Sequence, residues 1–326
     1  MVNYLKTHKW KILAGAAVIG ACILIAQETY PALILAYIMI YGIGTTGLDI
    51  LFGYSGQISM GHAGLFAVGS YTSALLSVRC GVTPVLGILA GSVLATLTGL
   101  LIAVPASKLV KHFLSLMTIA FGQIVYMFVN ACQPLTNGAT GISSIPYISL
   151  FGFRLDTYYR CFFAYMILLI LVLIAKARII RSRVGRALIA IRENTVAAEG
   201  IGINIRAYKA MAFGISAFMM GLAGGLYAHM VTYISPETYN ATQSTLFMTM
   251  VLFGGIGTTM GPVVGAAVLM FVKEVFQFLQ IYQVLIYGVF ILIVLFFFPN
   301  GMVGLYADMK KRILKARRRG DGHAPA

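Results

Sequence analysis

Apolar runs long enough to cross a membrane occupy most of this 326-residue chain. The hydrocarbon core of a bilayer is about 30 Å thick, and a helix that spans it needs roughly 17 to 25 apolar residues. Ten per cent of the residues are charged, whereas a soluble domain has about a quarter. The pattern therefore predicts an all-α, polytopic membrane protein with about ten transmembrane helices. The runs lie near 12–26, 32–52, 60–78, 84–105, 113–132, 161–176, 207–229, 244–257, 261–279 and 282–298.

Two glycine-rich stretches, Gly53–His62 and Gly254–Pro262, interrupt these runs. Lipid cannot satisfy freed backbone groups, so such breaks at membrane depth must face a cavity or packed protein. Transporters build substrate passages from discontinuous helices, and we expect discontinuous or re-entrant segments here. The region 244–279 fits either one long helix or a re-entrant pair. The alternative for each break is a tight turn between closely packed helices. Candidate substrate-pathway residues are Asp49, Gly53, Gly56, Gln57, Ser59 and His62.

Asp49 is an acid within or close to an apolar run, where an unpaired carboxylate is costly and a functional role is the default expectation. Asp49 and Glu274 are the two acids within reach of such runs. His62 could pair with Asp49 across the break, although a bond from a helix-end histidine to a backbone carbonyl is the more common arrangement. A single acid near a helix end gives weak support for ion-coupled transport.

Basic residues predict the orientation of the chain. If the N-terminus is cytoplasmic and the passes alternate, 20 of the 24 Lys and Arg residues fall on the inner side. Cytoplasmic loops of membrane proteins carry such an excess, and cations near the surface attract anionic lipid. We therefore expect both termini in the cytoplasm and Thr136–Asp156 outside. The basic residues are distributed between the membrane spans, and this distribution argues against nucleic acid binding. The four outer cations are Arg79, Arg154, Arg160 and Lys273.

The chain divides into a single membrane domain, 1–306, and a basic cytoplasmic tail, 307–326. The domain includes a cytoplasmic loop at about 177–206, within a segment, Lys176–Lys209, that holds eight basic residues. A small or apolar stripe in this loop has helical spacing, which predicts one helix suited to docking in a groove of another protein. The alternative is a solvated loop whose arginines only set topology. The stripe comprises Leu188, Ile191, Thr195, Ala198 and Gly202.

Several blocks of the sequence resemble one known family. The AA-x-x-x-G core of the basic loop looks like the docking signature of ABC importer permeases. With RSRVGRALIAIREN before it, the segment is similar to LivM-type permeases of branched-chain amino acid importers. GLDILFGYSGQISMGHAGLFAVGSYTSALL, TNGATGISSIP and SPETYNATQSTLFMTMVLFGGIGTTMGPVVGAAVL match the same family. The generic signature begins with Glu, whereas this chain has Val196 there. The resemblance implies ATPase-docking roles for Arg186, Arg192, Glu193, Asn194, Ala197, Ala198 and Gly202.

The resemblance implies a transport subunit rather than an enzyme, in a bacterial inner membrane. Its expected partners are a second related permease, two cytoplasmic ATPases and a periplasmic substrate-binding protein. The chain contains no G-x-x-x-x-G-K-[ST] sequence, so we expect no cofactor in this chain and ATP bound by partner subunits. The alternatives are the same machinery carrying urea, an amide or another small acid, and a secondary carrier acting alone.

The four cysteines show neither C-x-x-C spacing nor nearby histidines, so no metal site is expected. Three of them fall near the predicted outer ends of helices, where a disulfide is conceivable. The simpler interpretation is that they pack as small apolar residues. They are Cys22, Cys80, Cys132 and Cys161.

Overall fold

The computed structural model describes residues 29–106, 111–150, 153–276, 288–289 and 292. The run predicted at 12–26 and the tail 307–326 lie outside these residues, as does nearly all of the run at 282–298. Five described helical segments are long and apolar enough to cross a membrane. The prediction of an all-α polytopic fold is thereby confirmed, while the count of about ten spans remains a prediction. The five segments are Thr29–Tyr54, Pro84–Pro105, Phe113–Ala131, Tyr158–Arg181 and Ile205–Val231.

The first half of the described chain forms helices that alternate with short connections. The elements are α2 (Thr29–Asp49), the π-helical η1 (Ile50–Tyr54), α3 (His62–Arg79), α4 (Pro84–Ala106), α5 (Lys111–Ala131), α6 (Gln133–Thr136) and η2 (Gly138–Thr140). A two-stranded antiparallel hairpin, β1 (Ser149–Leu150) and β2 (Phe153–Arg154), follows in the predicted outer loop.

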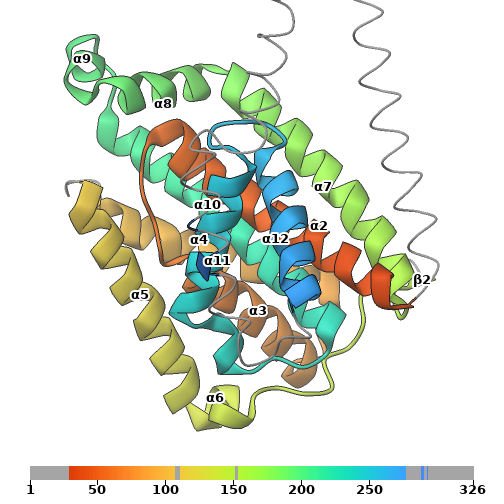
Figure 1. Ribbon diagram of the computed structural model, residues 1–326. Coiled ribbons are helices and arrows are strands. Elements are labelled where there is room, and N and C mark those ends of the chain that lie inside the picture. The colour runs from red at the N-terminus through yellow and green to blue at the C-terminus, as the bar shows by residue number, and fades with distance from the viewer. Residues whose placement is uncertain (1–28, 107–110, 151–152, 277–287, 290–291, 293–326) are drawn as a thin grey trace, which may run out of the picture.

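The second half begins with a long helix that turns directly into the basic loop. Its elements are α7 (Tyr158–Arg181), α8 (Arg183–Glu193), α9 (Thr195–Gly200), α10 (Ile205–Val231), η3 (Pro236–Tyr239), α11 (Ala241–Gly254) and α12 (Gly261–Val275). In Figure 1, α8 and α9 lie at one end of the molecule and α6 at the other. The loops predicted to be inner and outer therefore lie at opposite ends.

Small residues allow helices α3, α4 and α10 to pack closely. A methyl group added at Gly69 would clash with the backbone of Gly221, and one added at Gly91 would clash with the backbone of Gly69. In membranes, where water does not drive helices together, such close backbone approach is a main source of packing energy. Helices α2 and α10 form the buried centre, whereas α4, α5 and α7 present apolar faces outward.

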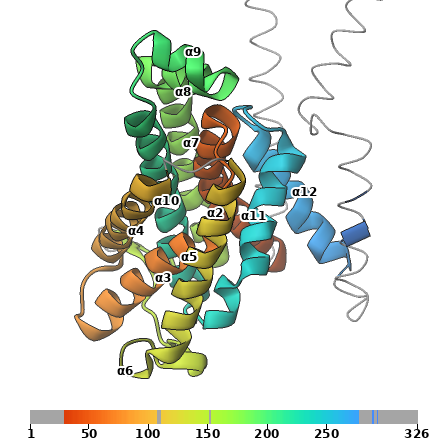
Figure 2. The ribbon, with the colours of Figure 1, turned by 90° about the vertical axis from the view of Figure 1, so that its left-hand side faces the viewer.

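Helices α11 and α12 fold back against each other as a pair (Figure 2). Helix α11 contains 14 residues, which at 1.5 Å per residue gives about 21 Å, less than the hydrocarbon thickness. The loop 255–260 joins them, and Gly255 and Gly257 within it have positive φ angles of 112° and 70°. The single long helix considered for this region is therefore wrong, because the described residues form two helices that pack against each other.

Candidate functional site

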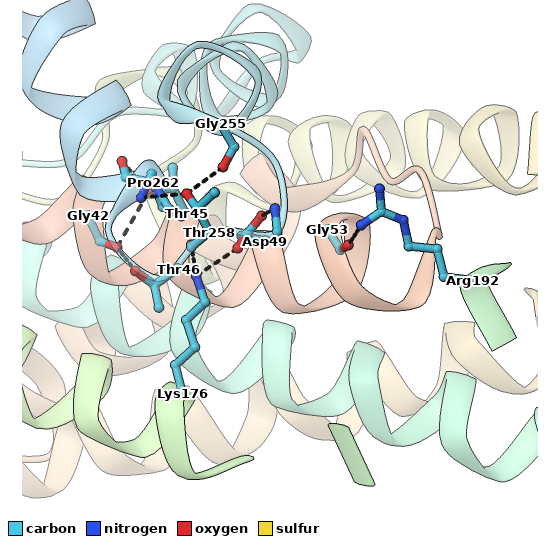
Figure 3. A network of polar contacts seen from close by, with 12 residues as sticks. Gly42, Thr45, Thr46, Asp49, Gly53, Lys176, Arg192, Gly255, Thr258 and Pro262 are labelled. Atoms are coloured by element: carbon cyan, nitrogen blue, oxygen red, sulfur yellow. Dashed lines mark hydrogen bonds and ion pairs between the residues drawn. The ribbon is translucent and has the colours of Figure 1, made fainter. Parts of the chain in front are cut away.

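A buried ion pair lies where α2 meets α7. The Lys176 ammonium is 2.7 Å from the Asp49 carboxylate, and neither side chain is exposed. Figure 3 shows Lys176 reaching from its helix to the end of α2. A buried pair is tolerated when further hydrogen bonds satisfy the remaining donors and acceptors. The pairing of His62 with Asp49, considered as one arrangement, is not observed, because Lys176 takes that place.

The remaining bonds of this pair go to the loop 255–260. The Gly257 amide donates to Asp49 Oδ1 at 2.7 Å, and Lys176 Nζ donates to the Thr258 carbonyl at 2.9 Å. One turn earlier on α2, the Thr45 hydroxyl lies 3.4 Å from the Pro262 carbonyl. The ion pair therefore joins three parts of the chain: the end of α2, the end of α7 and the connection between α11 and α12.

Arg192, from the last turn of α8, contacts the same region. Its guanidinium donates to the Gly53 carbonyl in η1 (Figure 3). A methyl group added at Gly53 would lie 2.6 Å from the Gly257 amide nitrogen and would also clash with the Asp49 carboxylate. Gly56 has a positive φ of 71°, and a methyl group there would lie 3.3 Å from Arg192 Cγ. Glycine is required at Gly53 by close contact and favoured at Gly56 by backbone conformation.

The polar break after η1 is buried against other helices. His62 bridges two hydroxyls, with Nδ1 2.9 Å from Ser59 and Nε2 2.7 Å from Ser216 of α10. Gln57 donates to Ser55 at 2.8 Å and to the Lys209 carbonyl at 3.2 Å. The expected backbone bond of His62 is thus replaced by hydroxyl partners. These contacts satisfy the requirement that polar groups at membrane depth be enclosed by protein.

The basic loop forms two helices instead of the single helix that the stripe predicted. The break comes at Asn194, whose extended backbone ends α8 and whose side-chain oxygen accepts from the Ala197 amide at 3.1 Å. This bond caps the start of α9. Ala198 is 2% exposed and, like Leu188 and Ile191, faces the protein's own interior. Three of the five stripe residues are therefore packed inside the chain, whereas Thr195 and Gly202 are exposed.

The exposed side of α9 is different from the predicted one. Val196 and Ile201 are 79% and 76% exposed, although both are apolar. Gly202 ends the segment with a positive φ of 82° and, like Gly200, has open space where a methyl group would lie. Of the other predicted docking residues, Arg186, Glu193 and Ala197 are also exposed. The tip of α9, defined here as Val196–Gly202, presents apolar and small residues together with Glu199 at the end of the molecule predicted to be inner.

Comparison with known proteins places this architecture in a family. A family model described as "Branched-chain amino acid transport system / permease component" matches residues 30–297. The chain belongs to this permease family. It is 29% identical to the high-affinity branched-chain amino acid transport system permease protein LivM of Escherichia coli K12, over 81% of this chain and 68% of that protein. It is therefore a multi-pass membrane protein and a transport subunit of the permease class.

Two further relatives bear on the range of the family. A probable LivM permease from Methanocaldococcus jannaschii is 24% identical over 87% of this chain and 97% of its own length. A nucleoside ABC transporter permease, NupC of Lactococcus lactis, is 24% identical over 61% of this chain and 67% of its own length. No solved structure shows significant similarity to the chain.

Lys176 is the site residue that sequence reasoning missed, since it was counted among the inner cations that set topology. The signal that could have identified it is its position inside an apolar run. Asp49 occupies a corresponding position in another run, and two opposite charges at the ends of apolar helices indicate a buried pair. Among the described cysteines, Cys80, Cys132 and Cys161 are free, so the conceivable disulfide among them is not formed.

Proposed function

We propose that the chain is the membrane-spanning permease subunit of an ABC importer for branched-chain amino acids, driven by separate ATPase subunits. The match to the permease family over residues 30–297 carries this proposal. The LivM proteins of Escherichia coli and Methanocaldococcus jannaschii, which bear that function in their names, support the cargo. The chain works in the inner membrane of a bacterium, with both termini in the cytoplasm.

The proposed partners are a second related permease, two cytoplasmic ATPases and a periplasmic substrate-binding protein. ATP is bound by the ATPases, and this chain needs no cofactor of its own. The division of basic residues supports the orientation, since the loop with α8 and α9 carries many of them. Substrate selection lies mainly in the binding protein, so the passage need only be weakly polar and wide enough.

The ATPases dock on α8 and the tip of α9. Val196 and Ile201 are the apolar side chains that a groove would cover, and the open space at Gly200 and Gly202 lets a partner approach the backbone. Exposed charged residues, Arg186 and Glu193, lie beside this surface. An apolar centre with a polar rim is the usual composition of a protein interface.

The break Gly53–His62 belongs to the substrate pathway in this proposal. Its polar side chains are enclosed in this conformation, with Ser59 and His62 almost completely buried. Alternating access requires helices to move relative to one another around the pathway. Helix α3 begins at His62, whose ring bonds to hydroxyl groups. Because the break before it lacks a regular helical backbone, movement there disrupts few backbone hydrogen bonds.

The test is uptake by the complete complex. The chain is co-expressed with its second permease, ATPases and binding protein, reconstituted into proteoliposomes, and supplied with radiolabelled leucine. Uptake that requires ATP inside and binding protein outside supports the proposal. Uptake by this chain alone without ATP identifies a secondary carrier. ATP-driven uptake of urea, a short amide or a nucleoside, with none of leucine, retains the machinery and rejects the cargo.

A further inference from the structure

We infer that Asp49 and Lys176 are positioning residues for transport, which make the loop 255–260 follow the movement of the docking helices. The inference rests on the proposed function and assigns the route by which movement at α8 reaches the pair formed by α11 and α12. It concerns the ion pair and its two bonds to the loop, one from the Gly257 amide and one to the Thr258 carbonyl. Neither residue needs to touch the substrate.

The first step is the direct connection between Lys176 and the docking segment. Lys176 lies in the penultimate turn of α7, which ends at Arg181, and α8 begins at Arg183 after one residue. The Ser182 hydroxyl caps α8 by accepting from the Val184 amide at 3.2 Å. With so short a connection, a shift of α8 must displace the end of α7. Lys176 moves with it, and its bonds pass the displacement to Asp49 and Thr258.

The second step is a separate contact from the other end of α8. Arg192 donates to the carbonyl of Gly53, and Gly53 packs against both Asp49 and Gly257. Asp49 and Gly53 are four residues apart at the junction of α2 with η1, so they lie on about the same face. Helix α7, which leads into α8, and the last turn of α8 thus contact one small region through Lys176 and Arg192 (Figure 3). Two contacts resist rotation as well as translation, which a single contact does not.

The third step is the conformation of the parts that receive the movement. The end of α2 is π-helical over Ile50–Tyr54, a form that is rare and often found at functional sites. The loop 255–260 contains Gly255 and Gly257 with positive φ, and glycine passes between backbone conformations at low cost. A charged pair with fixed geometry between two deformable segments defines their relative position. Hydrophobic residues would pack there as stably but would not fix the direction of each bond.

The experiment removes the pair without leaving a charge unpaired. The double variant Asp49→Asn/Lys176→Met is assembled in the complete complex, and ATP hydrolysis and leucine uptake are measured in the same proteoliposomes. We expect uptake per ATP hydrolysed to fall roughly tenfold, within the usual range of coupling between distant sites, while hydrolysis stays near the wild-type rate. A residue needed only for folding would lower both in proportion to the amount of complex.

The matched control is the ion pair at the opposite end. Arg160 and Asp156 are 2.8 Å apart, but their side chains are 46% and 49% exposed. Asp156→Asn/Arg160→Met should leave the ratio of uptake to hydrolysis unchanged. A wild-type ratio in the inner double variant overturns the inference. A wild-type complex that takes up no branched-chain amino acid overturns the proposed function instead, and the two failures are thereby distinguished.

A second measurement uses the native pair and needs no cargo, and it tests the movement of the loop even if the double variant does not assemble. Met260, at the end of the loop, is 55% exposed. With the four native cysteines replaced, Met260→Cys is labelled with a thiol reagent in the complex, either free of nucleotide or trapped with ATP. The inference requires the labelling rate to change severalfold between these states. Equal rates overturn it.

Discussion

The Lys176 ammonium and the Asp49 carboxylate lie 2.7 Å apart with both side chains fully buried. The second carboxylate oxygen accepts from Gly257, and the ammonium also donates to Thr258. Because each charge is satisfied partly by the other and partly by the backbone of one loop, removal of either partner affects two elements at once. This arrangement yields predictions for stability that are separate from those for transport.

Lys176→Met should strongly destabilise the permease, because it leaves the Asp49 carboxylate buried without its partner. Breaking a buried pair from one side typically costs about 3 to 5 kcal/mol. The thermal unfolding midpoint of the purified complex in detergent measures the effect, and adding Asp49→Asn should recover much of the loss. Arg160→Met, in the exposed pair, should cost at most about 1 kcal/mol. Equal midpoints for Lys176→Met and the wild type would show that the pair does not stabilise the fold.

Gly53→Ala should prevent normal assembly, since its methyl group would meet the Asp49 carboxylate and the Gly257 backbone, where neither neighbour can easily move. Overpacking of a close contact commonly costs about 1 to 3 kcal/mol. Gly42→Ala is the matched control in α2, because its methyl group would lie an ordinary 3.5 Å from Leu169. The yield of folded complex after size-exclusion chromatography measures both. A normal yield of Gly53→Ala would contradict the tight packing seen at this junction.

Much of the architecture could be predicted from the sequence, because lipid imposes helical structure on any apolar run that crosses it. The glycine-rich breaks also predicted where helices are interrupted. Which partner each buried polar group finds could not be predicted. Lys176 and Asp49 are 127 residues apart, and helical periodicity within a run says nothing about contacts between runs. A search for opposite charges at corresponding ends of apolar runs would have paired them.

The docking segment shows a different limit of sequence reasoning. Spacing by three and four residues predicted a continuous helix, but Asn194 offers its side chain to the Ala197 amide and starts a new helix instead. The change of direction at Asn194 means that the stripe does not continue on one face. Ala198, expected on the surface, is buried, and Val196, noted only as a departure from the family signature, is exposed.

His229→Leu should loosen the outer loop. The His229 ring is 2.7 Å from the Pro146 carbonyl through Nδ1 and 2.7 Å from the Ser73 hydroxyl through Nε2. Loss of these bonds frees the loop and leaves the Ser73 hydroxyl buried without its partner, at a cost of about 1 to 3 kcal/mol. We expect faster hydrogen exchange at the Ile142 and Ile145 amides, which bond to carbonyls that follow α10 or lie at its end. Unchanged exchange would show that other contacts hold the loop.

The control for this prediction is Tyr233→Phe. It removes an exposed hydrogen bond of 3.1 Å to the Thr140 carbonyl in the same region. Because water replaces an exposed partner at little cost, exchange at the two isoleucine amides should remain close to that of the wild type.

The orientation of the chain can be tested with single cysteines in a background without native ones. Glu199 and Ser149 are exposed near opposite ends of the molecule. In spheroplasts, an impermeant thiol reagent should label Ser149→Cys at once and Glu199→Cys only after the membrane is opened, because the positive loop stays in the cytoplasm. The reverse pattern would invert the proposed topology. Detergent-solubilised samples, in which both sites should react, control for local reactivity.

Val196→Asp should separate the ATPases from the permease without unfolding it. The side chain is 79% exposed, so the acid remains hydrated in the free chain, whereas a docked partner would bury it and impose a desolvation cost. A loss of about 2 kcal/mol, typical of a central interface residue, reduces affinity by about thirtyfold.

Co-purification of ATPase per folded permease measures this loss. Tyr147→Asp, at an exposed apolar position of the outer loop, should retain the ATPase fully. Ala198→Glu should instead lower the amount of folded permease, because Ala198 is buried within the chain. Full ATPase retention by Val196→Asp would move the docking surface away from the tip of α9.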